Sequence, residues 1–409
     1  MKLVYLHQYF VTPDQSGGIR SYSLAKRLVE KGHEVHMITS ETHGQRSGGS
    51  PEDGWRVNDV AGITVHSIPV SYDNSMSYVS RMIAFAKFAI ASCRRAASIE
   101  CNVVFATSTP LTIAIPGIFA AWRQRVPMVF EVRDLWPDVP IALGALRNPV
   151  LRWLARRLER LAYTKARHVV ALAPGMREAV LATGCKSPDE VSVIPNGADL
   201  EVFSAASQGQ ESLRSEHGLG GKKLLVYAGA FGVANGTAYL VELAYACLKV
   251  DSTVVIVGLG DGKERPEVLD YAREKGVLDN NLLLPGSVAK HEAARWVQSA
   301  DLALALFTGP RVLWKDATQN KFFDALAAGV PMACNFRGWQ CEIAEENSVG
   351  FVLDADDPDA AARLVSTKLS DASWVAGARK RSRELASTEY SMDKHATRLE
   401  AILDKAAQA

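Results

Sequence analysis

The sequence predicts an α/β protein built from two doubly wound parallel sheets. The chain has 409 residues, more than one hydrophobic core usually supports, so two or three domains are expected. Short apolar runs alternate with helical patterns along both halves, which is typical of βαβ units. A stretch rich in Ser, Gln, Glu and Gly, residues 200–223, separates the halves and indicates a linker.

Charge and cysteine content restrict the class of protein. The 46 basic and 45 acidic residues nearly balance, so we expect no nucleic-acid partner. Six cysteines are scattered without a C-x-x-C pair, which indicates reduced thiols in the cytosol. No run of about 18 uncharged apolar residues occurs, and MKLVYLHQYF is typical of a first buried strand. We therefore expect a cytoplasmic protein, either free or peripheral at the inner face of the plasma membrane.

The chain opens with a predicted βαβ unit. The strands are Lys2 to His7 and His33 to Thr39, and the helix between them is Ile19 to Lys31. The loop after the first strand carries Gly17 and Gly18, where absent Cβ atoms allow backbone to approach a phosphate. Simple turn glycines are the alternative. Because G-x-G-x-x-G is missing, a dehydrogenase is not supported.

The same alternation continues through the first half. One strand runs into the octapeptide EVRDLWPD. Ligands of open α/β sheets lie at the carboxyl ends of strands, so Arg133 and Asp134 are expected at a catalytic or acceptor site, although Asp134 could also cap a turn. The remaining elements are strands within 57–69 and at 103–106, 126–132, 168–172 and 191–195, and helices at 78–97, 110–125, 150–165 and 174–183.

The second half repeats the pattern. Its glycine-rich turn Gly258-x-x-x-Gly262-Lys263 is one residue short of a P-loop, and Glu264 stands where Ser or Thr would hold magnesium, so an NTPase is not supported. The predicted domains are 1–205, 206–388 and a final segment 389–409 that packs back on the first domain. The elements are strands at 224–229, 253–258, 281–285, 300–307, 332–335 and 350–353, and helices at 237–248, 294–300, 358–369, 373–386 and 392–407.

The segment DATQNKFFDALAAGVP places two carboxylates, Asp316 and Asp324, eight positions apart. A carboxylate accepts two vicinal hydroxyl donors at once, and such charge-assisted bonds are about twice as strong as neutral ones. Backbone N–H groups at a helix N-terminus attract diphosphate. The pattern therefore fits a nucleotide-sugar site. The alternative is a solvated loop acid followed by a first-turn helix acid.

This segment resembles the donor-sugar motif of retaining GT-B glycosyltransferases of family four, whose two acids are usually Glu. Gly17-Gly18 and the loop IPNGAD fit the same family, and EVRDLWPD resembles its branch of N-acetyl-L-fucosamine transferases in bacterial surface-polysaccharide synthesis. The resemblance covers essentially the whole chain. It implies two Rossmann-like domains facing across a cleft, with donor on the second and acceptor on the first.

The resemblance also implies an activity. A hexose-type sugar, with N-acetylated and 6-deoxy sugars as candidates, would pass from a donor, expected to be UDP-linked, to a glycan or polyprenyl-diphosphate-linked acceptor of lipopolysaccharide or O-antigen type. The anomeric configuration would be retained without metal or cofactor. The implied catalytic residues are Asp134, Arg133 and Asp316, and the implied donor-binding residues are Gly17, Gly18, Gly229, Gly258, Gly286, Lys321 and Asp324.

Two departures from the family pattern affect this site. The family commonly has a His near the strand end that here reads Arg133-Asp134, so no catalytic His is carried over. The Arg and Lys that usually hold diphosphate are replaced by Ala230 and Asn235. Lys321 is the first candidate to replace that cation, and Arg311 the second.

Two predicted helices, Tyr78 to Ala97 and Val150 to Lys165, combine apolar stripes with arginines such as Arg152, Arg156 and Arg160. Basic amphipathic helices are typical of membrane-surface elements. A buried stripe with solvated arginines is the alternative. Two rivals to a transferase also remain at this point: a sugar-nucleotide epimerase and a non-catalytic nucleotide-sugar-binding protein.

Overall fold

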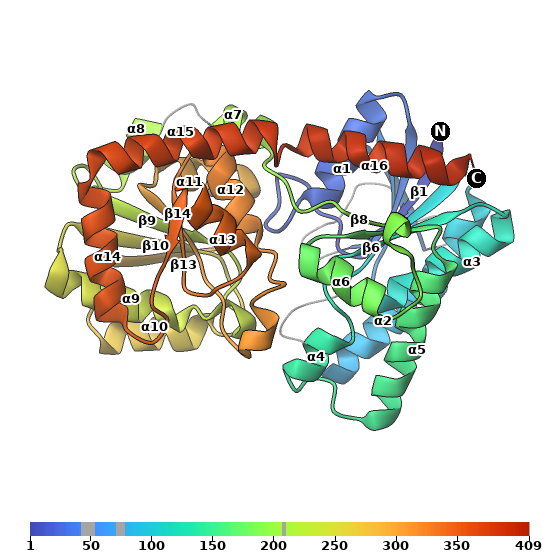
Figure 1. Cartoon of the computed structure of the whole chain (residues 1–409), viewed down its shortest axis with the longest axis horizontal. Coiled ribbons are helices and arrows are strands. Elements are labelled where there is room, and N and C mark those ends of the chain that lie inside the picture. Colours follow the sequence, from blue (N-terminus) through green and yellow to red (C-terminus); the bar gives the residue numbers. More distant parts are fainter. Residues whose placement is uncertain (42–53, 71–77, 207–209, 409) are drawn as a thin grey trace. The chain divides into compact units, whose positions relative to one another are not determined.

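The computed structural model describes residues 1–41, 54–70, 78–206 and 210–408, which form two α/β units (Figure 1). Unit 1 comprises Met1–Val11, Ile19–Pro195 and Asp393–Ala409, and unit 2 comprises Thr12–Gly18 and Asn196–Met392. The predicted class, two Rossmann-like parallel-sheet domains, is confirmed. The division falls at Pro195, before the predicted boundary at 205, and the loop Thr12–Gly18 groups with unit 2.

Unit 1 is organised around an eight-stranded sheet of order β3-β4-β2-β1-β5-β6-β7-β8. Among the described strand pairs of this sheet, β3–β4 alone is antiparallel. The chain moves outward from β1 in one direction and from β5 in the other, so the switch point of the sheet lies between β1 and β5. The strands are β1 Lys2–Leu6, β2 Glu34–Ser40, β3 Arg56–Val60, β4 Ile63–Ile68, β5 Val103–Thr107, β6 Met128–Val132, β7 His168–Ala171 and β8 Val191–Val193.

The helices of unit 1 follow the predicted pattern closely. Asn148 caps α5 by accepting bonds from the backbone N–H groups of Val150 and Leu151, with Pro149 at the first helical position. The helices are α1 Arg20–Glu30, α2 Tyr78–Ser98, α3 Ala114–Gln124, α4 Asp138–Ala142, α5 Pro149–Lys165, α6 Pro174–Ala182 and α16 Met392–Ala407. Within unit 1, α16 is tied to α1 by ion pairs from Arg27 to Asp393 and from Lys31 to Glu400.

Unit 2 is organised around a six-stranded parallel sheet of order β11-β10-β9-β12-β13-β14. Its switch point lies between β9 and β12. Helices α9 and α10 cover one face, and α11 and α12 cover the other (Figure 1). The strands are β9 Lys223–Ala228, β10 Val254–Leu259, β11 Leu282–Gly286, β12 Leu302–Ala305, β13 Met332–Cys334 and β14 Gly350–Val352; the helices after residue 235 are α9 Ala238–Val250, α10 Arg265–Glu274, α11 Lys290–Ser299, α12 Asn320–Ala328, α13 Trp339–Glu346, α14 Pro358–Ser370 and α15 Ala372–Thr388.

The predicted linker at 200–223 is wrong. The structure forms two short helices there, α7 Leu200–Ala206 and α8 Gln210–Glu216, and both pack on α11. Phe203 and Leu213 are buried in the same core as Trp296 and Phe322. Each short helix needs only one or two apolar anchors, so polar outer faces dominate the composition and imitate a linker.

The expectation of reduced thiols is wrong for two of the six cysteines. Cys334, the last residue of β13, forms a disulfide with Cys341 in the first turn of α13. The intervening loop turns back on itself, which brings residues seven positions apart into contact. Cys93, Cys101, Cys185 and Cys247 are free thiols. Across the described parts of the chain, no helix is long and apolar enough to cross a bilayer.

Candidate active site

Polar side chains gather at the carboxyl ends of three neighbouring strands of unit 1. His7 follows β1, Thr109 follows β5, and Arg133 and Asp134 follow β6. Arg133 Nη1 lies 3.0 Å from His7 Nε2, and the Thr109 hydroxyl donates to Asp134 at 2.7 Å. Asp134 is exposed. The two residues predicted from the octapeptide therefore lie next to the switch point of the sheet and contact residues that follow both strands flanking it, in the region where ligands of such folds bind.

His7 is the residue that sequence reasoning missed at this site. It is only 3% exposed, and burial, reinforced by the nearby Arg133 charge, holds the pKa of its imidazole well below its usual range. Arg133 can only donate, so His7 Nε2 accepts and the ring proton lies on Nδ1. The site thus pairs a neutral His with a permanent cation. The feature of the sequence that could have identified His7 as a site residue is its position directly after the first buried strand.

A buried ion pair lies close to these polar residues in the same unit. Arg20, the first residue of α1, contacts Glu131 of β6 at 2.8 Å, with both side chains almost fully buried. The same guanidinium donates to the carbonyl oxygens of Ile194 and Pro195. Burial opposes the charge on Glu131, but Arg20 and Arg133 together hold its pKa below the usual range. Glu131 is therefore a charged structural residue, whereas Asp134 and Asp138 of this octapeptide are exposed.

In unit 2, Lys321 of α12 crosses the end of strand β9. A Cβ placed on Gly229 would lie 2.3 Å from Lys321 Cε, so a side chain at this position would displace the end of the lysine. The ammonium lies 4.9 Å from the ring centre of Tyr227 and 3.1 Å from Gln319 Oε1. Burial lowers the pKa of Lys321 to about 8, Asp324 opposes that shift, and Lys290 adds to it. The first candidate cation thus lies beside a glycine predicted to bind the donor.

Asp324 is not the first-turn helix acid of the alternative interpretation, because α12 begins at Asn320. Its Oδ2 lies 2.6 Å from Lys290 Nζ, and the two side chains are only 18% and 12% exposed. Lys290 is the first residue of α11, and no spacing in the sequence links it to Asp324. The second carboxylate oxygen of Asp324 is not engaged by this ion pair.

Asp316 presents an unpartnered carboxylate oxygen. Its side chain is 13% exposed, and its Oδ1 is buried without a hydrogen-bond partner among the described residues. Lys315 Nζ lies 4.0 Å from the other oxygen. Burial raises the pKa of Asp316 above its usual value. A buried acceptor without a partner is rare in native proteins and fits a site that a ligand hydroxyl completes.

The predicted donor-binding glycines differ in their surroundings. A Cβ on Gly18 would lie 2.8 Å from Asn320 Nδ2 at the start of α12, and Gly17 has a positive φ of 129°. Gly286 also has a positive φ, 106°, and its carbonyl accepts from a backbone N–H of the β10 turn. Gly258 lies inside β10, where a Cβ would be 2.7 Å from Leu284, so it serves close side-chain packing.

The other predicted cation has different partners. Arg311 is exposed, pairs with Asp356 at 3.4 Å and stacks over Trp314. Ala230 directly follows Gly229, and its carbonyl accepts from the Tyr227 hydroxyl.

In the part of the chain that the structure describes, no group of three or more His, Cys, Asp or Glu side chains could hold a metal ion.

The fold and its polar strand ends define a two-domain α/β protein of the GT-B class. Residues 17–197 match the family model of the glycosyl transferase 4-like domain, and residues 222–371 match that of the glycosyl transferases group 1. The two matches together cover most of the chain. The chain therefore belongs to the GT-B glycosyltransferases that combine these two domains.

Known proteins resemble the chain at low identity. Spore coat protein SA of Bacillus subtilis (strain 168) is 23% identical over 53% of this chain, and the match spans only 59% of that protein. The GDP-mannose-dependent alpha-(1-6)-phosphatidylinositol monomannoside mannosyltransferase of Mycobacterium tuberculosis (strain CDC 1551 / Oshkosh) is 24% identical over 73% of this chain and 74% of its own. The structure of Anabaena HepE in complex with UDP-glucose covers 99% of this chain and 100% of its own, with 16% identity and a TM-score of 0.71, and thus shows the shared fold.

Proposed function

We propose that this glycosyltransferase moves a hexose-type sugar from a UDP-linked donor to a glycan or lipid-linked acceptor, with retention of the anomeric configuration and without a metal. The observation that carries the proposal is the group at the end of β9, where Lys321 crosses Gly229 on the same segment that holds Asp316 and Asp324. HepE, which shares the fold, was solved with UDP-glucose, and this supports a nucleotide-sugar donor.

The donor side follows from the chemistry of unit 2. The ammonium of Lys321 would neutralise the diphosphate, and the absent side chain of Gly229 leaves room for the end of that lysine. The unpartnered Oδ1 of Asp316 would accept a sugar hydroxyl. Asp324, held by Lys290, would accept the ribose hydroxyls. Positive charge placed where the leaving diphosphate develops charge stabilises the transition state, which is the role that a metal fills in other transferases.

The acceptor side follows from unit 1. Exposed Asp134 would orient the acceptor hydroxyl by accepting its hydrogen bond, and Arg133 would attract an acceptor that carries phosphate groups. Because His7 is buried and neutral, its part is to hold Arg133 in place. The octapeptide EVRDLWPD, with its Trp136-Pro137 step, resembles the branch of the family that includes N-acetyl-L-fucosamine transferases, so UDP-linked N-acetylated and 6-deoxy sugars are the first donors to test.

Donor binding is measured by thermal stabilisation in a panel of UDP-, GDP- and dTDP-sugars. A ligand at about 100 times its dissociation constant adds about 2.7 kcal/mol to the free energy of unfolding. We expect a UDP-sugar to stabilise the wild type, and Asp324→Ala to weaken its affinity about ten- to a hundredfold, since a charged hydrogen-bond partner is worth roughly 1.5–3 kcal/mol. An Asp324→Ala variant with donor affinity within twofold of wild type would contradict the assignment.

Turnover separates the proposal from its rivals. Incubation with the donor and a lipid-linked acceptor should give a product whose anomeric configuration, read by NMR, equals that of the donor, and chelator should leave the rate unchanged. Inversion, or activity that chelator removes and manganese restores, would overturn retention or metal independence. An epimerised donor in the absence of acceptor identifies an epimerase. Donor binding without turnover of any acceptor identifies a binding protein.

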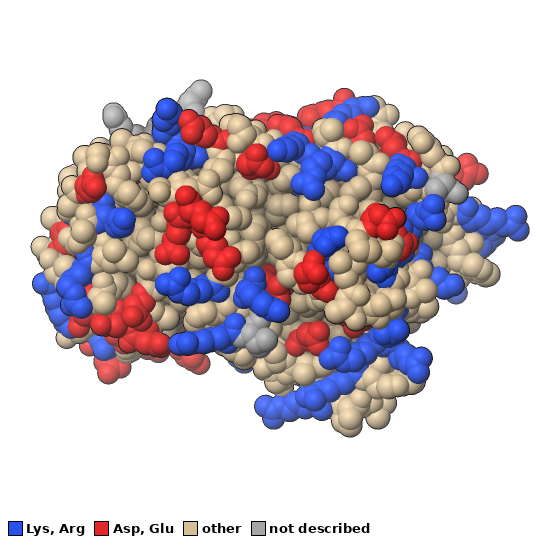
Figure 2. Space-filling view, in the orientation of Figure 1, with Lys and Arg blue, Asp and Glu red and all other residues tan. Residues whose placement is uncertain are grey.

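The lipid-linked acceptor places the enzyme at a membrane, and three neighbouring helices of unit 1 support this. The apolar stripe of α5 is largely exposed, so the alternative of a buried stripe is wrong there. Figure 2 shows Lys and Arg side chains beside uncharged surface over the lower right of the view, where Figure 1 draws α5. The large apolar side chains exposed on these helices are Ile83 and Ile90 on α2, Ile115, Phe119 and Trp122 on α3, and Val150, Leu151, Trp153, Leu154 and Leu161 on α5.

The predicted row of arginines on α5 is not sufficient by itself to support membrane binding, because these side chains have partners within unit 1. Arg152 and Arg160 donate to the carbonyl oxygens of Leu146 and Thr183, and Arg156 pairs with Asp138. Charge reversal in this row would therefore disturb unit 1 itself. Aromatic side chains are the better anchors, since exposed Trp residues among basic ones suit the interface of an anionic bilayer. The mycobacterial relative is named for a phosphatidylinositol-based acceptor, which agrees with a lipid surface as the partner.

We expect the protein to sediment with phosphatidylglycerol vesicles, and less so at high salt because charge attraction is screened. The double variant Trp122→Ser/Trp153→Ser should lose about tenfold or more in vesicle affinity, since burying each large apolar side chain contributes about 1.5–3 kcal/mol. Tyr245→Ser/Val250→Ser on α9 is the matched control and should sediment as the wild type does. Equal sedimentation of all three proteins would remove the support for membrane docking.

A further inference from the structure

The start of helix α12 lacks a cap from its own residues. Gln319 is the N-cap, and its side chain forms no capping hydrogen bond. The segment before it, Ala317 to Gln319, belongs to no helix or strand, so its backbone groups without a local hydrogen bond need partners elsewhere. This segment lies between the two proposed donor-binding residues Asp316 and Lys321, and its geometry therefore sets theirs.

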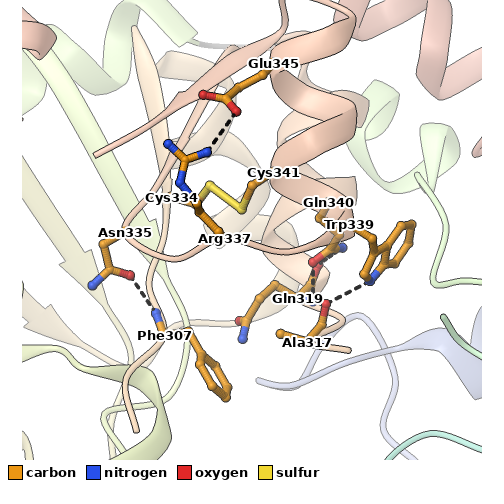
Figure 3. Close-up of a disulfide and its surroundings, with 10 residues drawn as sticks. All are labelled: Phe307, Ala317, Gln319, Cys334, Asn335, Arg337, Trp339, Gln340, Cys341 and Glu345. Atoms are coloured by element: carbon orange, nitrogen blue, oxygen red, sulfur yellow. Dashed lines mark hydrogen bonds and ion pairs between the residues drawn. A yellow bond between two sulfur atoms is a disulfide. The ribbon is translucent and has the colours of Figure 1, made fainter. Parts of the chain in front are cut away.

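The missing partners come from the first turn of α13 (Figure 3). Gln340, which is 0% exposed, donates from Nε2 to the Gln319 carbonyl at 3.0 Å, and its Oε1 accepts from the Gln319 backbone N–H at 2.7 Å. The Trp339 indole N–H donates to the Ala317 carbonyl at 3.0 Å. One side-chain amide thus bonds both backbone groups of the N-cap residue Gln319, and two consecutive residues hold both ends of the segment.

The turn that carries these two side chains is itself fixed. Cys341, the next residue, is joined by a disulfide to Cys334 at the end of β13. Gly338, just before the turn, lies so close to Trp314 that a Cβ would meet its carbonyl oxygen at 2.3 Å. We call Trp339 and Gln340 the clamp and residues 316–321 the donor segment. Through the disulfide, the clamp connects the donor segment to the central sheet of unit 2.

We propose that Gln340, assisted by Trp339, is a positioning residue of the donor site. It would act through Gln319, because both of its polar groups are engaged by that residue. It holds Gln319, whose side-chain Oε1 accepts from the Lys321 ammonium at 3.1 Å, and it fixes the backbone that follows Asp316. This inference rests on the proposed donor site and adds that the site depends on an amide from a separate helix.

Both polar groups of Gln340 are committed to backbone groups of one residue, which makes the clamp specific in geometry. A side chain of the same length without polar groups keeps the packing and loses both bonds. A carboxylate of the same length keeps the acceptor and places a second oxygen against the Gln319 carbonyl. Neither change removes side-chain volume, so an effect that both variants share reports the loss of the hydrogen bonds to Gln319.

The test compares Gln340→Met and Gln340→Glu with Asn281→Leu. Asn281 is an equally buried amide of unit 2 that donates to the Ala244 carbonyl, outside the donor segment. We expect both Gln340 variants to raise the KM for the UDP-sugar about tenfold or more, with a smaller change in kcat, and Asn281→Leu to lower thermal stability while the KM stays at the wild-type value. Trp339→Phe removes the indole hydrogen bond and should raise the KM a few-fold. This variant is the alternative test of the clamp if Gln340→Met fails to fold.

A second measurement follows the cation itself. In the wild type, donor affinity should fall as pH rises through about 8, the pKa to which burial lowers Lys321. Released from Gln319, the ammonium gains water, so the inflection should move to higher pH in Gln340→Met and stay in place in Asn281→Leu. If the Gln340 variants kept the wild-type KM and the wild-type inflection in the pH dependence of donor affinity, the proposed role of Gln340 would be wrong and the proposed donor site would be unaffected. A wild-type protein that binds no nucleotide-sugar would overturn the proposed function and the clamp together.

Discussion

Replacing Lys321 with Met is expected to lower kcat by about 10²- to 10³-fold, which is the usual effect of removing one group that stabilises charge in a transition state. The family's Arg and Lys positions are Ala230 and Asn235 here, and Lys321 is the cation that lies against Gly229. Its removal should take from the departing diphosphate the positive charge that lies against Gly229. The rate of sugar transfer at saturating donor is the measurement.

The proposed role of Lys321 also predicts the direction in which donor affinity changes with pH. Lys321 must be charged to bind diphosphate, so the donor affinity of the wild type should be full below pH 8 and fall above it. A depressed Lys pKa also means that the charged form weakens the fold, so Lys321→Met should be at least as stable as wild type near neutral pH. Lys249→Met, an exposed lysine of α9, is the control and should keep both rate and pH profile. A Lys321→Met enzyme that turns over at a tenth of the wild-type rate or faster would contradict the assigned role.

Replacing Arg20 with Met is expected to cost roughly 3–5 kcal/mol of folding free energy, because it leaves the Glu131 carboxylate buried without its ion-pair partner. It also removes the donors that hold the carbonyl oxygens of Ile194 and Pro195. Urea unfolding with a signal from unit 1 measures the change. Arg156→Met, which breaks an exposed pair with Asp138, should cost no more than about 1 kcal/mol.

The loss should depend on pH in a defined direction. In the wild type the pKa of Glu131 is held below its usual range, so the pair stabilises the fold above that range. Without Arg20, burial favours the protonated acid, so the variant should be closer to wild-type stability at pH 5 than at pH 8. A double variant that also replaces Glu131 with Gln should recover part of the loss. Equal losses in Arg20→Met and Arg156→Met would mean that the buried pair contributes no more than a surface one.

Much of the fold was predictable from local sequence. Alternating apolar runs and helical periods located the described strands and most of the helices, although α4, α10 and α13 were not predicted. Caps such as Asn148-Pro149 set helix starts, because hydrophobic period and capping depend on neighbouring residues only. The same reasoning failed at 200–223, where two short helices expose polar faces, and at Cys334 and Cys341, whose pairing depends on how one loop folds back.

The sequence by itself determined the two-sheet architecture, the acid segment with Asp316 and Asp324, and the strand-end position of Arg133 and Asp134. Only the tertiary structure decided their partners. Strand order places His7 beside Arg133 across 126 positions and Arg20 against Glu131 across 111, and helix packing brings Lys290 to Asp324 across 34 and Gln340 to Gln319 across 21. The period of a strand or helix is a property of adjacent residues, whereas these contacts depend on which elements become neighbours when the sheets assemble.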